Sequence, residues 1–194
     1  MKHLKLFFVC LLMAVFSIGQ VWGEITSPYT HTFAKNQLGT ASGAKTLSSV
    51  SWTQSTATYI GWDANRGVQI GSKNSPQSGS AFTLTSTAFS GAITKVEITA
   101  CAYNATDSKL NVSVGGITYN SEVTLGTTAT THEFTGNESG TIIISMQTGS
   151  SGRAMYLKEI KVTFGSSSGG GGQQTTVKFR PFFAHFCPIR FSVS

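Results

Sequence analysis

The chain has 194 residues, of which only 11% are charged, and its formal net charge is +6 at pH 7. Its 21 glycines, its many serines and threonines and its lack of segments rich in Ala, Glu, Lys and Leu indicate an all-β protein. Five of the 14 basic residues lie near the two ends of the chain, whereas all 8 acidic residues lie between Glu24 and Ser168. This body is almost neutral, which excludes a basic nucleic-acid-binding surface.

Residues 1–23 have the organisation of a secretory signal peptide. Lys2 and Lys5 precede an almost wholly apolar run over residues 6–18, and Gly23 supplies a small residue for cleavage. The run is shorter than the roughly 20 residues that cross a bilayer, so we expect no membrane span in the mature chain. Cys10 lacks the small-residue context of a lipoprotein signal, which argues against a lipid anchor. The expected location is secreted or cell-surface.

Residues 24–164 predict one domain of about ten short strands, because apolar and polar residues alternate in short runs separated by turn residues. The runs are centred on residues 29–34, 50–52, 59–60, 68–70, 82–84, 95–120, 132–134, 142–146 and 154–164. Short strands at regular spacing without a helix predict a two-sheet antiparallel β-sandwich of jelly-roll type.

Residues 95–120 predict three consecutive strands. Val96 and Ile98 alternate with polar residues, and Leu110 and Val112 do so again after a polar break. The glycine pair at 115–116 supplies the positive φ of a tight reversal into a third strand. We expect these strands to form a meander whose apolar face is covered by a second sheet.

The last predicted strand changes phase along its length. Met155 and Leu157 are in one phase, whereas Ile160 and Val162 are in the other. One extra residue near 158–159 would restore the alternation, which is typical of a β-bulge or of a strand that bends between sheets.

Cys101 is the only cysteine of the predicted domain, so we expect no internal disulfide bond. It alternates out of phase with its apolar neighbours, and no catalytic constellation of histidine and asparagine surrounds it in the sequence. We expect a packed, inert thiol.

Several of these runs resemble a β-sandwich module that is repeated in secreted proteins of gut bacteria. The resemblance is carried by Gly67-Val68-Gln69-Ile70-Gly71-Ser72, Phe82-Thr83-Leu84, Phe89, Ile93-Thr94-Lys95-Val96, Val112-Ser113-Val114-Gly115-Gly116 and the run from Tyr156 to Phe164. It covers residues 29–164 and is similar to the galactose-binding-like jelly rolls, which commonly sit beside other domains. It implies a non-catalytic accessory module and gives no residue-by-residue ligand site.

Beyond the domain, residues 165–174 read as a flexible Gly/Ser linker. Residues 175–194 contain five phenylalanines, three basic residues and no acidic residue, and are too short for a domain. One hypothesis is that a longer natural protein continues here and that this end is a truncation or a shifted reading frame. The other is a basic, aromatic segment that binds a membrane surface or a partner, although Pro181 and Pro188 interrupt a helix.

Neither catalysis nor a bound cofactor is predicted. His31 and His132 lack metal-ligand spacing, and no EF-hand-like run is present, so we predict no metal site and no cofactor. No nucleophile motif is recognisable, so we predict no catalytic residue and expect the protein not to be an enzyme. A glycosidase would need two carboxylates that face each other across a cleft, and the sequence does not exclude such a pair. The carboxylates in or beside connections are Asp63, Asp107, Glu122, Glu133 and Glu138.

The best candidate for a ligand site lies in residues 52–66. Sugars present flat apolar faces ringed by hydroxyl groups, so their sites combine an aromatic ring with carboxylate, amide or guanidinium groups. Four residues of that kind stand within five positions: Trp62, Asp63, Asn65 and Arg66. They predict a carbohydrate-binding or cell-surface targeting module whose partner is a glycan or cell-surface polysaccharide.

Two alternatives remain open from the sequence. In one, Trp52 and Tyr59 belong to the core and Trp62 only covers the edge of the sandwich. In the other, the domain is a structural or adhesive spacer that binds protein or nothing small. An exposed aromatic ring beside polar side chains would favour the sugar site over both.

Overall fold

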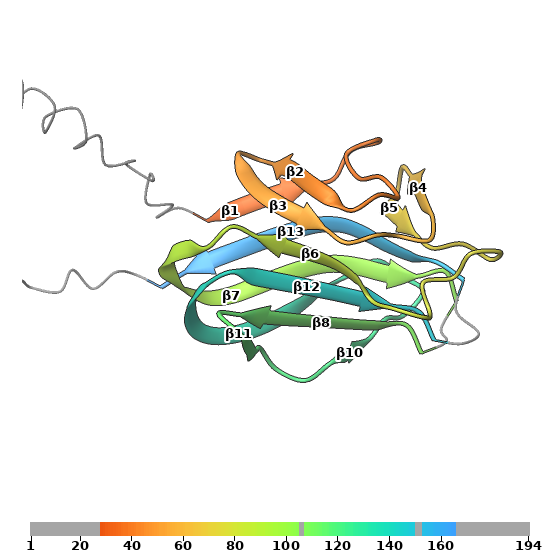
Figure 1. Ribbon diagram of the computed structural model, residues 1–194. Coiled ribbons are helices and arrows are strands. Elements are labelled where there is room, and N and C mark those ends of the chain that lie inside the picture. The colour runs from red at the N-terminus through yellow and green to blue at the C-terminus, as the bar shows by residue number, and fades with distance from the viewer. Residues whose placement is uncertain (1–27, 105–106, 150–152, 166–194) are drawn as a thin grey trace, which may run out of the picture.

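A computed structural model describes residues 28–104, 107–149 and 153–165. These residues form thirteen strands and no helix, in two antiparallel sheets that lie face to face (Figure 1). The predicted all-β sandwich is therefore confirmed. Across the same ranges no helix could span a membrane. The predicted signal peptide at 1–23, all but the first residue of the linker at 165–174 and the tail at 175–194 lie outside the described residues.

Each sheet mixes strands from distant parts of the chain. In spatial order the first sheet contains β11 (Thr130–Gly140), β7 (Phe89–Ala102), β13 (Met155–Phe164), β5 (Gly67–Ile70) and β4 (Ile60–Asp63), and β1 (Tyr29–Thr32) also pairs with β13. The second sheet contains β10 (Val123–Thr124), β8 (Lys109–Val114), β12 (Ile142–Gln147), β6 (Phe82–Ser86), β3 (Val50–Gln54) and β2 (Gly43–Leu47), and β9 (Ile117–Thr118) pairs with β8. Most neighbours within each sheet are distant in sequence, so local patterns alone do not set the order.

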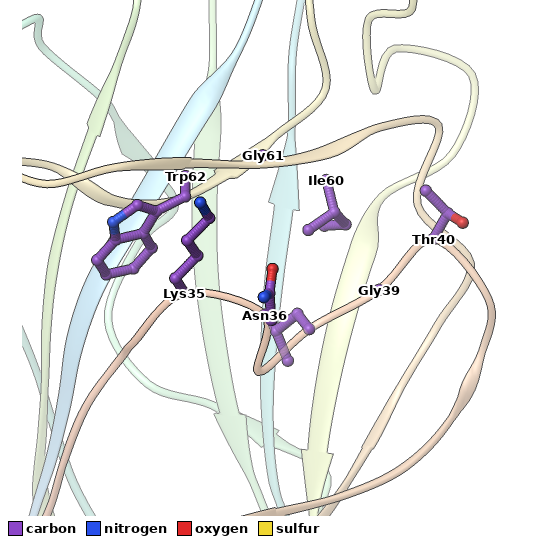
Figure 2. Close-up of a pocket in the computed structure, with 8 residues that line it drawn as sticks. Lys35, Asn36, Gly39, Thr40, Ile60, Gly61 and Trp62 are labelled. Carbon is purple, nitrogen blue, oxygen red and sulfur yellow. The ribbon is translucent and has the colours of Figure 1, made fainter.

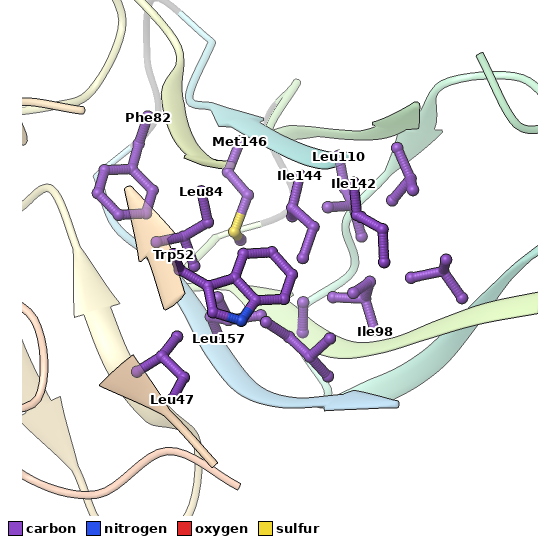
Figure 3. Packing of buried hydrophobic residues seen from close by; sticks show 14 of the residues in the cluster. Leu47, Trp52, Phe82, Leu84, Ile98, Leu110, Ile142, Ile144, Met146 and Leu157 are labelled. Carbon is purple, nitrogen blue, oxygen red and sulfur yellow. The ribbon is translucent and has the colours of Figure 1, made fainter. Parts of the chain in front are cut away.

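The core lies between the two sheets. Alternation turns one side chain in two inward from each strand, so that Leu84 and Met146 of the second sheet face Ile98 and Leu157 of the first (Figure 3). Trp52 is fully buried among them, and its indole nitrogen donates a hydrogen bond to the Tyr29 hydroxyl at 3.1 Å. Burial of each such side chain stabilises the fold by about 1.5–3 kcal/mol, which explains how the domain does without a disulfide.

The expected meander is wrong. β7 belongs to the first sheet and β8 to the second, so these two consecutive strands do not pair as a hairpin. Alternation marks a half-buried strand, but it is the same whichever sheet the strand joins. The next reversal is confirmed, because β8 and β9 pair across Gly115 (φ 56°) and Gly116 (φ 86°). β2 and β10 were not predicted.

The predicted irregularity in the last strand is confirmed as a β-bulge. Leu157 pairs with Ala100 and Glu159 pairs with Thr99, so Lys158 is the extra residue. The bulge also divides the other edge of β13, where β5 pairs with residues 155–157 and β1 pairs with residues 159–162. The Phe33 amide donates to the Lys158 carbonyl at 3.0 Å, and the chain then leaves the sheet.

The free edge of β11 is occupied by side chains that follow β9. The Asn120 amide donates to the Glu133 carbonyl at 3.1 Å, and its oxygen accepts from the Thr135 amide at 3.5 Å. The Tyr119 hydroxyl donates to the Ile93 carbonyl and accepts from the Glu138 amide, both at 2.7 Å, where the pairing of β11 with β7 is irregular. These contacts satisfy main-chain groups that an unpaired edge would expose.

Candidate functional site

A cavity of about 320 Å³ lies where the chain leaves the first sheet at the bulge and passes over β4 (Figure 2). We call it the Trp62 pocket. It is lined by Lys35, Asn36, Leu38, Gly39, Thr40, Ile60, Gly61 and Trp62. One wall is therefore the loop after β1 and the other is edge strand β4. β1 and β5, the neighbour of β4, pair with β13 on either side of the bulge.

The loop wall is held at its start by Gln37. The Gln37 side-chain oxygen accepts hydrogen bonds from the Ala34 amide at 2.7 Å and from Nε2 of His31 at 3.1 Å. Because this oxygen only accepts, Nε2 carries the proton, and Nδ1 accepts from the Ser48 hydroxyl at 2.9 Å. Burial lowers the pKa of His31 and outweighs the opposite effect of Gln37, so the ring is neutral at neutral pH.

The end of the loop wall is held by Gln54. This side chain is fully buried, and its amide nitrogen donates to the carbonyls of Gly39 at 2.6 Å and Ala41 at 2.7 Å. Its oxygen accepts from the Gly39 amide at 3.2 Å, and Leu38 anchors the middle of the loop in the core. The wall is thus fixed before a ligand arrives, which reduces the entropy lost on binding.

Trp62 forms the opposite wall. Its side chain is partly buried and contacts the core, whereas Trp52 is fully buried. Figure 2 shows the Lys35 side chain beside the indole, with Asn36 below Gly61. The pocket therefore combines an aromatic ring with an ammonium group and an amide. The expectation that Trp52 belongs to the core is confirmed. Tyr59 does not belong to the core, because it is 42% exposed.

Asp63 and Arg66 close the turn between β4 and β5. One Asp63 oxygen accepts from the amides of Asn65 at 2.9 Å and Arg66 at 3.0 Å. The other accepts from Nε of Arg66 at 3.0 Å and Nη2 at 2.8 Å. These hydrogen bonds, that from the Arg66 side chain first, hold the pKa of the Asp63 carboxyl below its usual range. The Asp63 carboxylate is thus committed to the turn, and the side chain of Asn65 is exposed.

The four predicted ligand residues do not meet in one site. Successive side chains of a strand point to opposite faces, so Trp62 turns toward the core while Asp63 turns outward. Arg66 follows Asp63, and its guanidinium carbon lies 3.9 Å from the ring centroid of Tyr156 on the outer face. The sequence reasoning missed Lys35 and Asn36, because nothing in residues 35–40 indicates that they face β4.

No histidine, cysteine or acidic residue is among those that line the Trp62 pocket. In the described ranges, no group of three or more His, Cys, Asp or Glu residues is placed to hold a metal ion. Cys101 is a free, fully buried thiol, and burial raises its pKa, which keeps it protonated. The prediction that this thiol is packed is therefore confirmed, and its inertness stays a prediction.

No protein-family model matches the chain, and no curated protein matches it. Solved structures with a similar fold include the CBM36-1 domain of a multidomain xylanase from the hindgut metagenome of Trinervitermes trinervoides, with 11% identity, a TM-score of 0.43 and coverage of 72% of this chain and 98% of that one. A carbohydrate-binding module CBM36 in complex with calcium and xylotriose is 17% identical, with a TM-score of 0.42 and coverage of 71% and 99%. A family two carbohydrate esterase from Cellvibrio japonicus is 14% identical, with a TM-score of 0.42 and coverage of 72% and 35%, so the chain spans about a third of its length. The likeness concerns overall architecture and assigns no residue a role.

Proposed function

We propose that this protein is a secreted, non-catalytic carbohydrate-binding module and that the Trp62 pocket holds a sugar. The observation that carries the proposal is a partly exposed indole that forms one wall of a cavity whose other wall is fixed by buried side chains. The volume of the pocket, about 320 Å³, lies at the lower end of the range for small-molecule sites, which suits a single sugar ring.

The pocket offers both kinds of contact that a sugar needs. The C–H face of a pyranose ring stacks on the Trp62 indole, and the ring hydroxyls accept from the Lys35 ammonium and exchange hydrogen bonds with the Asn36 amide. This lining contains no carboxylate, histidine or cysteine that could activate a nucleophile or form an acid–base pair, which supports binding without catalysis. Residues 1–23 would export the module, and residues 165–174 would join it to other domains.

The first test is binding of the full chain to a glycan array and to polysaccharides in affinity gels, with tryptophan fluorescence recorded. We expect a bound glycan to quench the fluorescence of Trp62. Trp62→Ala and Lys35→Ala should each weaken glycan binding about tenfold or more, since each removes a principal contact. Lys73→Ala is the matched control, because Lys73 is an exposed lysine outside the pocket.

Two results would contradict the proposal. The first is unchanged glycan binding in both pocket variants while their unfolding curves match that of the parent chain. The second is a folded chain that binds no glycan, which would favour the structural or adhesive spacer.

A further inference from the structure

The outer face of the first sheet carries a row of side chains that the Trp62 pocket does not use. Strand pairing aligns Gly61 of β4 with Gln69 of β5, Gln69 with Tyr156 of β13, and Tyr156 with Cys101 of β7. Tyr156 and Cys101 are buried, although they point away from the main core. The Arg66 guanidinium, stacked on the Tyr156 ring, is one of the groups that cover Tyr156 on this outer face.

Two exposed tyrosines lie along this row. Tyr59 is 42% exposed, and its ring lies over Gly61, since a Cβ atom added there would come within 2.9 Å of the ring and 3.2 Å of the Gln69 side-chain oxygen. Tyr103 is 49% exposed and is positioned by its amide, which donates to the Ala154 carbonyl at 2.8 Å. Three spacings between neighbouring strands separate β4 from β7, or about 14 Å. The row is thus longer than one sugar ring.

The Tyr103 end of the row is positively charged. The guanidinium carbons of Arg66 and Arg153 lie 5.9 Å and 5.6 Å from the Tyr103 ring centroid. Asp63 occupies Nε and Nη2 of Arg66, whereas Arg153 forms no ion pair within the described residues. We call Tyr59, Gln69, Arg66, Tyr103 and Arg153 the tyrosine–arginine strip.

The other end of the same face is electrically balanced. Glu97 lies 3.2 Å from the Lys95 ammonium and 3.4 Å from that of Lys161, and Lys95 also lies 3.4 Å from Glu133. The two lysines and the two glutamates there form ion pairs with one another. The unpaired positive charge on this face therefore lies in the strip. A local surplus beside exposed aromatic rings is the arrangement that recognises an anionic ligand with flat apolar faces.

We propose that the tyrosine–arginine strip binds an acidic polysaccharide, a chain of uronic acids. Its carboxylates pair with Arg153 and with the free nitrogen of Arg66, and its rings stack on Tyr103 and Tyr59. Guanidinium matches the planar carboxylate with two parallel hydrogen bonds, which an ammonium group does not. A single-stranded nucleic acid shares the stacking, but the nearly neutral body lacks the series of cations that a phosphate backbone requires.

The test is affinity electrophoresis of the full chain in gels that contain polygalacturonate, dextran sulfate or a neutral glucan, with a labelled oligonucleotide titrated separately. We expect polygalacturonate to retard the chain most, and salt to weaken the effect. Arg153→Ala and Tyr103→Ala should each weaken this binding about tenfold, and Arg153→Lys should restore only part of it. Both residues are exposed or half-exposed, so the urea midpoint of each variant should match that of the parent.

Matched variants separate this site from other sources of affinity. Lys73→Ala removes the same charge from an exposed residue that is not part of the strip and should leave binding unchanged. Trp62→Ala should also leave it unchanged, so a failure of the Trp62 pocket is distinguishable from a failure of the strip. Binding through the basic residues of 175–194 would persist in Arg153→Ala and would overturn the proposal. It would also be overturned by an equal loss in Lys73→Ala, by stronger binding of dextran sulfate or the oligonucleotide, or by no retardation in polygalacturonate.

Discussion

The two faces of β4 are built in different ways. On the inner face, Trp62 meets a loop whose backbone is fixed by the buried side chains of Gln54 and His31. On the outer face, the tyrosine–arginine strip consists largely of exposed side chains laid on a regular sheet. Substitutions that disturb the pocket should therefore change stability together with binding, whereas substitutions in the strip should change binding alone.

The largest expected effect concerns Gly67, at the bulge on which both faces depend. Its φ is 92°, and an added Cβ atom would collide with the Leu157 carbonyl and the Lys158 backbone. Because backbone cannot move aside cheaply, Gly67→Ala should lower the free energy of unfolding by about 3 kcal/mol or more. Urea denaturation followed by tryptophan fluorescence measures this.

Gly79→Ala provides the control, because nothing lies within 4 Å of a Cβ atom at that position. Its effect should stay within about 0.5 kcal/mol. Equal midpoints for the two alanine variants would show that the bulge tolerates a side chain and that the close approach of β5 to β13 is not essential.

An intermediate effect is expected from Gln54→Leu, which separates the two faces. The substitution leaves the Gly39 amide and the carbonyls of Gly39 and Ala41 without their partner, so it should lower the free energy of unfolding by about 1–3 kcal/mol. Glycan binding in the Trp62 pocket should weaken, while polygalacturonate binding stays unchanged. Thr53→Ala, on the exposed side of β3, should alter neither. A loss of both binding activities in Gln54→Leu would contradict the independence of the faces.

The smallest expected effect is a pH dependence of stability that originates at His31. Burial lowers its pKa in the folded state below the ordinary value of 6.5, so the unfolded chain binds more protons as the pH falls through that value. Stability should therefore be constant above about pH 6.5 and should decrease below it until the folded-state pKa is reached. Urea midpoints between about pH 7.5 and pH 5 should vary less in His31→Gln than in the parent.

His132 is the control for this measurement, because burial lowers its pKa as well. His132→Gln should remove its own share of the dependence and retain that of His31. A parent-like pH profile in His31→Gln would show that the ring does not titrate with folding.

Local patterns predicted much of the fold and little of the site. Alternation located most of the strands, and the change of phase between Leu157 and Ile160 located the bulge, because both are properties of consecutive residues. The assignment of β7 and β8 to different sheets depends on long-range pairing and left no local trace. β2 was missed because its sequence, GAKTL, contains only one large apolar residue, so that no alternation of apolar and polar residues is visible.

The prediction grouped four neighbouring residues into one site, whereas the fold places Trp62 and Arg66 on opposite faces of the first sheet. The strand predicted at 59–60 stopped before Trp62 and Asp63, which lie in β4 and therefore turn to opposite faces. Lys35 and Asn36 could not have been found from a strand pattern, since they lie in a loop distant in sequence from Trp62 that is held by Gln37 and the buried Gln54. Their position is a consequence of the tertiary fold.

Asn120 and Tyr119 bear on how copies of this domain would behave side by side. An uncovered strand edge is a template on which neighbouring chains add strands and aggregate. Here one amide side chain takes the main-chain positions at Glu133 and Thr135 that an added strand would use. The β11 edge of the first sheet is thus closed to strand addition by a neighbouring copy of the domain.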